Sequence, residues 1–304
     1  MHKSVLLEEC IQYLNLQEDS QIVDCTLGYG GHSSEVLKRI KRGFLFAFDQ
    51  DKEAISSSKK RLEEVASNHN FEIIESNFCH LKEELEKRGI SKVDGILYDL
   101  GVSSPQLDEG ERGFSFHQDA RLDMRMDQNQ FLTAHEVVNH YDYDTLVDIF
   151  RRYGEEKYAT SIARGIIESR PIDTTLELVE VIKNNVPEKY RREKHPARKV
   201  FQAIRIEVNN ELEVFEDSLR QALELLSVGG RICVITFHSL EDKICKEVFK
   251  EVSEIDSALK NLPVIPDEYL PNYKVIKTVS PGKEEIEENP RARSAKLRVI
   301  ERIG

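Results

Sequence analysis

Three aspartates stand where apolar runs of the sequence end. Asp24 closes the run "QIVD", Asp49 closes "GFLFAFD" and Asp99 closes "VDGILYD". Such runs are typical of strands buried on both faces of a parallel sheet, and open parallel sheets bind ligands at the carboxyl ends of their strands. We therefore expect the three carboxylates to lie at the ligand-binding edge of one sheet, where a carboxylate can accept a proton or a sugar hydroxyl.

A glycine-rich turn follows the first of these carboxylates. In "DCTLGYGGHS" the spacing Gly28-x-Gly30 begins a dinucleotide fingerprint, but Ser33 stands where its last small residue belongs, and the phosphate-loop pattern is absent. A fixed carboxylate at Asp24 would repel a pyrophosphate. It would suit a ligand with an ammonium or sulfonium group and no phosphate, which describes S-adenosyl-L-methionine. In the alternative interpretation, the two glycines make only a tight turn.

Two further residues fit that ligand. Asp49 comes about 20 residues after Gly28, where an acid hydrogen-bonds the ribose hydroxyls of a bound nucleotide. Phe78 follows the third apolar run, at a place where its ring could stack on adenine. Each has a structural alternative: Asp49 could cap the next helix, and Phe78 could belong to the core.

Strands alternate with helices through the first hundred residues. The four apolar runs cover residues 21–26, 43–51, 71–78 and 93–101. The pattern returns with a strand at 232–237 and a helix at 239–252, and two late strand candidates cover 273–278 and 296–303. This alternation predicts a parallel sheet with right-handed crossovers.

The middle of the chain has a different spacing of apolar residues. From about residue 130 to 186 the apolar spacing is helical, with capping-box patterns at Thr133–Glu136 and Thr174–Glu177. The economical interpretation is an α/β fold with an inserted all-helical domain. The α/β domain is discontinuous, over residues 1–107 and 200–304, and the insertion covers 108–199.

Composition and charge exclude several classes of protein. No apolar run approaches the roughly 18 residues of a membrane span, and five scattered cysteines without a C-x-x-C pair argue against disulfides and structural zinc. We expect a cytoplasmic protein with neither membrane nor metal. The formal net charge of -12 argues against nonspecific coating of nucleic acid, but two basic islands, residues 187–205 and 289–304, could hold RNA at chosen points.

Six motifs together carry a family resemblance that runs from about Val5 to Ile303. They are "DCTLGYGGHS", "DGILYDLGVSSPQLDEGERGFSF", "LDMRMD", "HPARKVFQAIRIEVNNEL", "GGRICVITFHSLED" and "NPRARSAKLR". The chain resembles the bacterial small-subunit (16S) ribosomal RNA cytosine-N4-methyltransferases. The resemblance implies a class I, Rossmann-like, S-adenosylmethionine-dependent methyltransferase sheet with a helical insertion. It also implies methylation of the exocyclic amine of a cytosine near the decoding centre, a cytoplasmic location and, as one option, a homodimer.

The resemblance assigns cofactor contacts to the loop and to the strand ends, namely Gly30, Gly31, His32, Asp49, Phe78, Asp99 and Gln106. Asp24 and Gly28 join this set from the loop pattern. The candidates for binding the RNA substrate come from the turn after the fourth strand, from a nearby aromatic pair and from the two basic islands: Ser103, Phe114, Phe116, Arg198, Lys199, Arg291 and Arg293.

Methylation of an amine requires help for the nucleophile. The lone pair of the cytosine amine is delocalised into the ring, so the nitrogen must pyramidalise and lose a proton as it attacks. Asp99 is the expected proton acceptor, and its alternative role is that of a cofactor ligand. His238 in "HSLED" is the second catalytic candidate, through the base or a phosphate, while Ser239 and Asp242 are expected to cap the helix. Carbon methylation by a cysteine is disfavoured, because Cys79 has no proline flank.

Two other functions stay open on the residues alone. One is a non-catalytic ribosome-assembly factor that binds the cofactor as a sensor. The other is a nucleotide-dependent dehydrogenase, against which Asp24, Ser33 and Asp99 all count.

Overall fold

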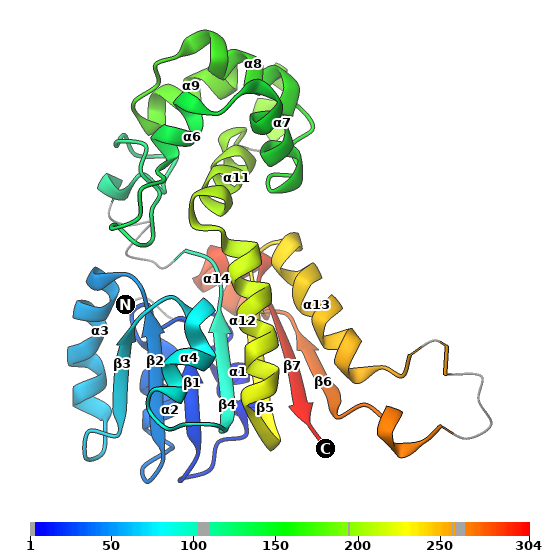
Figure 1. Cartoon of the computed structure of the whole chain (residues 1–304). Helices are drawn as coiled ribbons and strands as arrows, with labels where there is room; N and C mark the ends of the chain where they lie inside the picture. The colour runs from blue at the N-terminus through cyan, green and yellow to red at the C-terminus, as the bar shows by residue number, and fades with distance from the viewer. Residues whose placement is uncertain (1–3, 103–109, 194, 257, 260–264) are drawn as a thin grey trace. The chain divides into compact units, whose positions relative to one another are not determined.

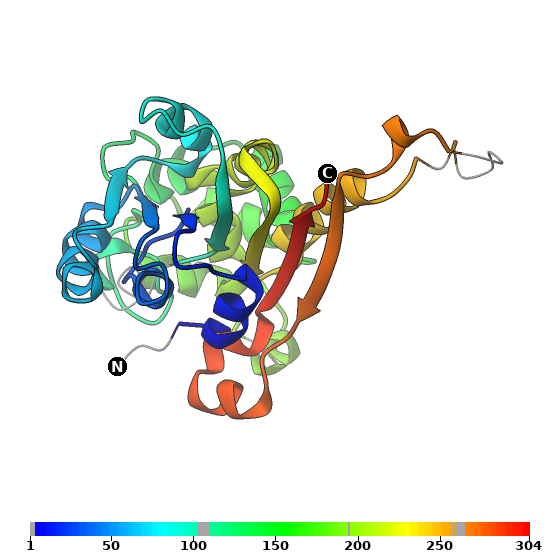
Figure 2. The ribbon, with the colours of Figure 1, turned by 90° about the horizontal axis from the view of Figure 1, so that it is seen from below.

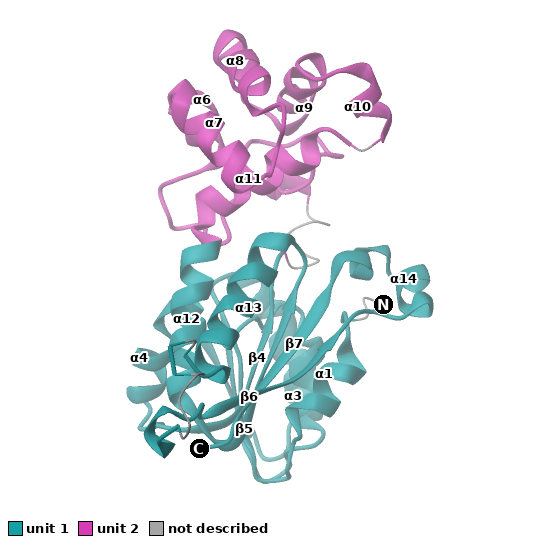
Figure 3. Cartoon of the chain, turned by 90° about the vertical axis from the view of Figure 1, so that its right-hand side faces the viewer, with its two compact units in different colours: residues 1–101, 212–304 teal, residues 102–211 magenta. Residues whose placement is uncertain are grey.

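The chain is divided into two compact units (Figure 3). The computed structural model describes residues 4–102, 110–193, 195–256, 258–259 and 265–304. Unit 1 comprises residues 1–101 and 212–304, and unit 2 comprises residues 102–211. The sequence-based boundary at 199/200 falls inside a single helix, α11 (Ala197–Asn209), whose apolar side chains pack in the core of unit 2. Because this helix is continuous and belongs to unit 2, the boundary between the units lies after it, at 211/212. The other predicted boundary, at 107/108, lies outside the described residues.

Unit 1 is built on a seven-stranded sheet with the order β3-β2-β1-β4-β5-β7-β6. Its strands are β1 (Gln21–Asp24), β2 (Phe44–Asp49), β3 (Phe71–Glu75), β4 (Val93–Asp99), β5 (Leu226–Thr236), β6 (Tyr273–Val279) and β7 (Lys296–Arg302). The first five strands are parallel, and β7 runs antiparallel to both of its neighbours. The order 3-2-1-4-5 is that of a Rossmann-like sheet, so the predicted fold class is confirmed.

Helices cover both faces of this sheet (Figures 1 and 2). The helices of unit 1 are α1 (Leu7–Leu14), α2 (Gly31–Leu37), α3 (Lys52–Val65), α4 (Leu81–Glu86), α12 (Glu211–Leu225), α13 (Ser239–Ser253) and α14 (Lys283–Glu288), with short 3-10 turns η1 (Phe78–His80), η3 (Asp267–Tyr269) and η4 (Pro290–Ser294). Neighbouring residues of a strand point to opposite faces. Ile96 and Tyr98 therefore pack with α4, α12 and α13, whereas Leu97 packs with α1, α2 and α3.

Unit 2 is helical and has an apolar core of its own. Its helices are η2 (Gly110–Arg112), α6 (Ala134–His140), α7 (Tyr143–Arg152), α8 (Ala159–Ser169), α9 (Thr175–Asn184), α10 (Glu188–Glu193) and α11. Both predicted helix caps are present, but only the second has the reciprocal bond of a capping box. Thr133 accepts a hydrogen bond from the backbone N–H of Glu136, and Thr174 and Glu177 form a complete capping box.

Two further expectations concern the whole chain. The five cysteines, all of them among the described residues, are free thiols. Within the described ranges, no helix has the length and apolar character that a membrane crossing requires.

Candidate functional site

Three strand ends bring the predicted carboxylates to one edge of the sheet. β1 lies between β2 and β4, and its Asp24 is in register with Ala47 and Leu97. Asp49 is two residues after Ala47 on β2, and Asp99 is two residues after Leu97 on β4. Both carboxylates therefore lie about 7 Å beyond Asp24 along the strand direction, one on each side of β1. The side chains that the sequence placed at one edge are neighbours there.

Asp24 lies beneath the glycine loop. The residue is 1% exposed, its Oδ1 accepts the backbone N–H of Thr26 at 3.0 Å, and its Oδ2 accepts the hydroxyl of Ser33 at 2.6 Å. Burial raises the pKa of this carboxyl, and the two hydrogen bonds oppose that rise. Because Asp24 is almost fully buried beneath the loop, whereas Asp49 is only partly buried, its placement favours a role in shaping the loop over direct contact with a ligand.

Thr26 and Ser33 belong to the site although the sequence did not single them out as functional. Besides its bond to Asp24, Thr26 accepts the backbone N–H of Asp99 through Oγ1 at 2.7 Å. The hydroxyl of Thr26 thus links the ends of β1 and β4. The only sequence signal for this link is the threonine of the D-x-T-x-G-x-G pattern.

The loop between β1 and α2 requires glycine at two positions. Gly28 and Gly30 have φ values of 50° and 71°, in the left-handed region that costs glycine little. A Cβ on Gly30 would also stand 3.3 Å from side-chain atoms of Leu62 and Ser58. The pattern therefore marks a constrained turn, which packs against α3.

Asp49 anchors this turn to β2. Its Oδ2 accepts the N–H of Gly28 and its Oδ1 accepts the N–H of Asp51, both at 2.9 Å. Burial raises the pKa of Asp49 to about 6, although the two backbone hydrogen bonds act in the opposite direction. The N-cap of α3 is Asp51, which accepts from Glu53, so Asp49 is not the cap. Each Asp49 oxygen keeps a second lone pair, and two hydroxyls of a ribose could donate to them.

Asp99 is the most perturbed acid at the sheet edge. Its side chain is 26% exposed, yet Oδ1 is buried and has no hydrogen-bond partner among the described residues. Burial raises its pKa to about 8, and the charges of Asp24 and Glu241 add to the rise. A buried acceptor without a donor is rare in folded proteins. The unpaired oxygen is therefore available to a donor from a ligand.

His32 faces Asp99 from the first turn of α2. Its Nε2 lies 3.2 Å from the carbonyl oxygen of Val5, and its Nδ1 lies 3.5 Å from Oδ2 of Asp99. Burial lowers the pKa of His32 to about 4, so the ring is neutral near pH 7. A neutral ring that donates from Nε2 to Val5 presents the lone pair of Nδ1 to Asp99. At 4% exposed, His32 is suited to orient Asp99.

Phe78 opens η1, directly beyond β3. Its ring meets that of Tyr98 edge-on, with centroids 5.7 Å apart, and it packs at the margin of the core under α4 and α12. The residue is only partly buried. Because the ring is not fully buried, core packing leaves adenine stacking possible.

His238 lies at the end of β5 as the N-cap residue of α13. Its side chain is 11% exposed, with Nε2 3.1 Å from Oε1 of Glu241, and neither buried ring nitrogen has the alignment of a hydrogen bond to a described residue. The expectation that Asp242 caps α13 is wrong. Glu241 accepts the N–H groups of Phe237 and His238, and Asp242 instead binds Arg298 at 2.7 Å, because β7 brings that guanidinium alongside α13.

The predicted RNA-binding residues are divided between the units. Arg291 and Arg293 are exposed on η4 in unit 1. In unit 2, Arg198 is exposed, whereas the ammonium of Lys199 donates to the carbonyl of Glu155 at 2.7 Å. Ser103 and Gln106 lie outside the described residues.

The aromatic pair of unit 2 splits into a core residue and a partly buried one. Phe114 is 6% exposed in the core of the unit, so packing removes it from the RNA-contacting set. Phe116 is only partly buried, and its ring stacks on that of His195, with centroids 4.5 Å apart. Phe116 alone of the pair keeps a ring that RNA could reach.

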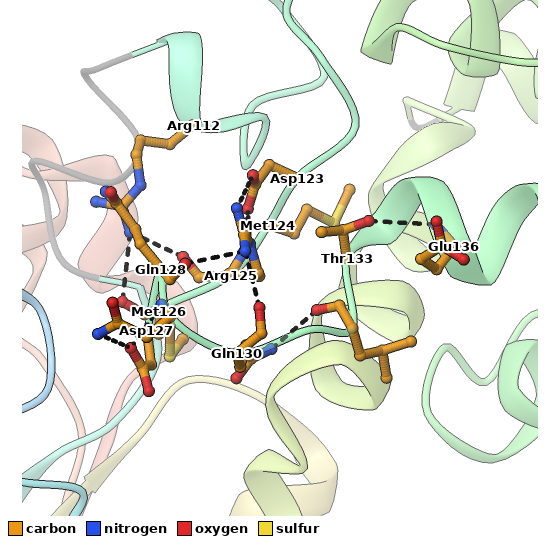
Figure 4. Close-up of polar contacts among 12 residues, drawn as sticks. Arg112, Asp123, Met124, Arg125, Met126, Asp127, Gln128, Gln130, Thr133 and Glu136 are labelled. Carbon is orange, nitrogen blue, oxygen red and sulfur yellow. Dashed lines mark hydrogen bonds and ion pairs between the residues drawn. The ribbon is translucent and has the colours of Figure 1, made fainter.

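Two arginines of the motif region have structural roles (Figure 4). Arg125 binds both carboxylate oxygens of Asp123, at 2.9 and 2.8 Å, and donates to the carbonyls of Gln128 and Gln130. Arg112, 8% exposed, donates to the carbonyl of Arg125 at 2.8 Å. These two guanidinium groups hold together the irregular segment between η2 and α6. Their role is therefore to fix the shape of that segment.

Comparison with known proteins settles what kind of protein this is. The model of the MraW methylase family matches residues 1–303. The chain belongs to the MraW methylase family. It is 54% identical over 308 residues to a protein of Exiguobacterium sibiricum named Ribosomal RNA small subunit methyltransferase H, with 99% of this chain and 98% of the relative covered. Among solved structures it is similar to an rRNA methylase from Streptococcus thermophilus, with 12% identity, a TM-score of 0.46 and coverage of 100% and 99%. As an MraW methylase the protein is a methyltransferase, which removes the dehydrogenase alternative.

The cofactor of this methylase is S-adenosylmethionine, and the residues at the sheet edge fit it. Asp49 keeps acceptor capacity for ribose hydroxyls, and the unpaired Oδ1 of Asp99 calls for a donor or a positive charge. Both carboxylates flank the turn that the two glycines make possible. Asp49 is therefore the residue best placed to hold the cofactor, whereas the free oxygen of Asp99 could accept from either the cofactor or the base.

Proposed function

We propose that this methylase transfers the methyl group of S-adenosylmethionine to the exocyclic N4 amine of a cytosine in 16S ribosomal RNA, near the decoding centre of the small ribosomal subunit. The observation that carries this proposal is Asp99, a carboxylate at the end of β4 with a buried oxygen that has no partner among the described residues. The relative named for small-subunit ribosomal RNA, 54% identical along nearly the whole chain, supports the substrate. Action on ribosomal RNA implies a cytoplasmic location, and the homodimer stays a prediction.

The bound cofactor supplies a methyl group activated by a positively charged sulfur. The protein supplies position and a proton acceptor. Asp49 and the turn at Gly28 orient the nucleoside part, and the backbone bond to Thr26 fixes the end of β4. Holding two reactants in line can lower the barrier more than any single acid or base.

Asp99 accepts the proton that the amine loses. In the free protein burial holds the pKa of this carboxyl at about 8, so a large fraction is protonated near neutral pH. A protonated carboxyl can donate to Nδ1 of His32, which accepts, whereas an ionised one is available to the N–H of the base. The neutral carboxyl must therefore lose its proton before it can serve as acceptor. A cation bound beside it would favour that ionisation.

The target base must leave its stack to reach the cofactor. His238 is proposed to contact the base or an adjacent phosphate from the end of β5. Arg198 and Lys199 in unit 2, and Arg291 and Arg293 in unit 1, are proposed to bind the RNA backbone. Unpaired or distorted loops are the usual targets of sequence-specific RNA binding, which agrees with a ribosomal site.

The test is transfer of labelled methyl groups to small ribosomal subunits that lack the modification, followed by mass mapping of the modified nucleotide. The expected product carries one methyl on N4 of a cytosine. A methyl on a ring carbon or on a ribose would refute the chemistry. An Asp99→Asn variant that binds the cofactor normally but transfers no methyl would support Asp99 as the proton acceptor, and full activity in that variant would remove Asp99 from this role.

A further inference from the structure

Unit 1 has a pocket beyond the carboxyl end of β5, on the side of that strand away from Asp99. Its volume is about 380 Å³, within the range of roughly 300–1,000 Å³ that is usual for small-ligand sites. The end of β5, the first two turns of α13, the end of η4 and the start of β7 line it, through Thr236, Phe237, His238, Ser239, Asp242, Lys243, Lys246, Ser294 and Lys296. The sequence singled out His238, Ser239 and Asp242, and it placed Ser294 and Lys296 in the basic island 289–304.

The lining is positively charged although the chain as a whole is acidic. Three lysines face one carboxylate, Asp242, which binds the ammonium of Lys296 at 3.1 Å. Among the described residues, Lys243 pairs only with Glu247, at 3.9 Å. Lys246 has no ion pair within the described part of the chain. Since the formal net charge is -12, a local excess of ammonium groups in a pocket favours an anionic ligand.

Polar groups in the wall of the pocket point to the same kind of ligand. The 15-residue helix α13 begins in the wall, and the N-terminal end of a helix favours negative charge. His238 contributes a ring that is 11% exposed, whose Nε2 lies 3.1 Å from Oε1 of Glu241 and neither of whose nitrogens is aligned for a hydrogen bond within the described residues. A buried imidazole nitrogen of this kind can donate to a phosphate oxygen.

The sheet places this pocket one strand away from the proposed acceptor. β5 lies between β4 and β7, with Ile235 in register with both Asp99 and Leu297. Neighbouring strands are about 4.8 Å apart, so the start of β7 lies roughly 10 Å from the end of β4. That separation suits a target base held at Asp99 and a backbone phosphate of the same strand in the pocket.

We infer that this pocket binds a backbone phosphate of the RNA strand that carries the target cytosine, with Lys243 and Lys246 as its main cations. The inference rests on the proposed function, since it needs an RNA substrate. It adds where a phosphate of that RNA binds. Phosphate contacts fix the position of a nucleic acid on a protein and carry no sequence information themselves. The pocket would therefore set which nucleotide of the strand reaches Asp99.

The test compares two double variants with the same change in charge. Lys243→Ala/Lys246→Ala removes two cations from the pocket. Lys59→Ala/Lys60→Ala removes two exposed lysines of α3, on the other face of the sheet and outside the pocket. Each variant is assayed for binding of a short single-stranded RNA over a range of salt concentrations, for KM and kcat on unmodified small subunits, and for affinity toward S-adenosylmethionine.

In the pocket variant we expect RNA affinity to fall about 10-fold. The slope of log affinity against log salt should decrease by about 0.7 for each phosphate that no longer meets a cation. KM for the subunit should rise by a similar factor, with kcat and cofactor affinity unchanged. A Lys243→Arg/Lys246→Arg variant should keep the salt slope. Equal decreases in affinity in the two alanine variants, or an unchanged slope in the pocket variant, would overturn the inference.

Two outcomes separate this inference from its premises. If the wild-type protein binds RNA but transfers no methyl to it, the proposed function fails, and the salt slope still decides whether the pocket holds RNA phosphate. The second measurement is the binding of inorganic phosphate. If the wild-type protein binds it through these lysines while RNA affinity is unaffected by their removal, the pocket is a site for a free anion and the inference is wrong.

Discussion

Replacing Asp99 by asparagine should stabilise the fold, and increasingly so as the pH rises. The pKa of this carboxyl is about 8 in the folded protein, against 3.8 for an ordinary aspartate. Between these two values the folded state binds more protons than the unfolded state. The free energy of unfolding of the wild-type protein therefore decreases as pH rises through this window, and asparagine, which does not titrate, lacks this decrease.

The size of the effect follows from the width of the window. Each pH unit inside it contributes about 1.4 kcal/mol to the difference between variant and wild type. From about pH 5.5 to about pH 7.5, the advantage of the variant should grow by roughly 2.7 kcal/mol. For a folding unit of this size, 1 kcal/mol corresponds to about 2–4 °C, so the difference in Tm should grow by roughly 5–11 °C.

The assay is thermal unfolding without cofactor at three pH values, followed by circular dichroism. The titrations of Asp49 and His32 are common to both proteins and cancel in the difference. Asp217→Asn, an exposed position on α12, is the control, and its difference from the wild type should stay constant with pH. If the Asp99→Asn difference is equally constant, the carboxyl of Asp99 is ionised throughout this range and burial does not raise its pKa.

Three further outcomes are expected. In the wild type, kcat/KM for S-adenosylmethionine, which reports the protein before the cofactor binds, should rise with pH up to about 8, because Asp99 must be ionised to accept a proton; a profile that is flat from about pH 6 to about pH 9 would contradict this. Asp49→Asn should weaken binding of S-adenosylmethionine about 10- to 100-fold in calorimetry, through the loss of charge-assisted hydrogen bonds, and unchanged affinity would remove Asp49 from the site. Arg125→Ala should lower the stability of the protein to urea by about 3 kcal/mol, since it leaves the half-buried Asp123 without its partner, whereas a loss of RNA binding at unchanged stability would show that the guanidinium contacts RNA instead.

Much of the sheet edge could be predicted because its signals are local. Each strand is a short apolar run, and the carboxylate at its end needs no distant information to be located, as Asp24, Asp49 and Asp99 show. The caps at Thr133 and Thr174 are equally local, since cap and partner are three residues apart.

The features that could not be predicted depend on contacts between distant segments. Asp242 resembles a helix cap in the sequence, but β7, more than fifty residues later in the chain, supplies Arg298 and binds it. The burial of Phe114 likewise depends on helices that follow it in unit 2. Lys243 and Lys246 do not stand out in the sequence, and Lys296 stands out only as part of the basic island 289–304, because the pairing of β5 with β7 is what brings it to α13.

The strand order has a consequence for how this protein is made. β4 is a central strand, yet its partner β5 begins at Leu226, after all of unit 2 has been synthesised. During translation the edge of β4 at Ile96–Tyr98 therefore has no β5 partner for about six seconds or more, at bacterial elongation rates of up to about 20 residues per second. The second partner of β5 is β7, Lys296–Arg302, which is synthesised later still. A nascent chain with an unpaired central strand is prone to aggregate, so yield in the cell should depend on chaperones that shield this edge until β5 and β7 have emerged from the ribosome.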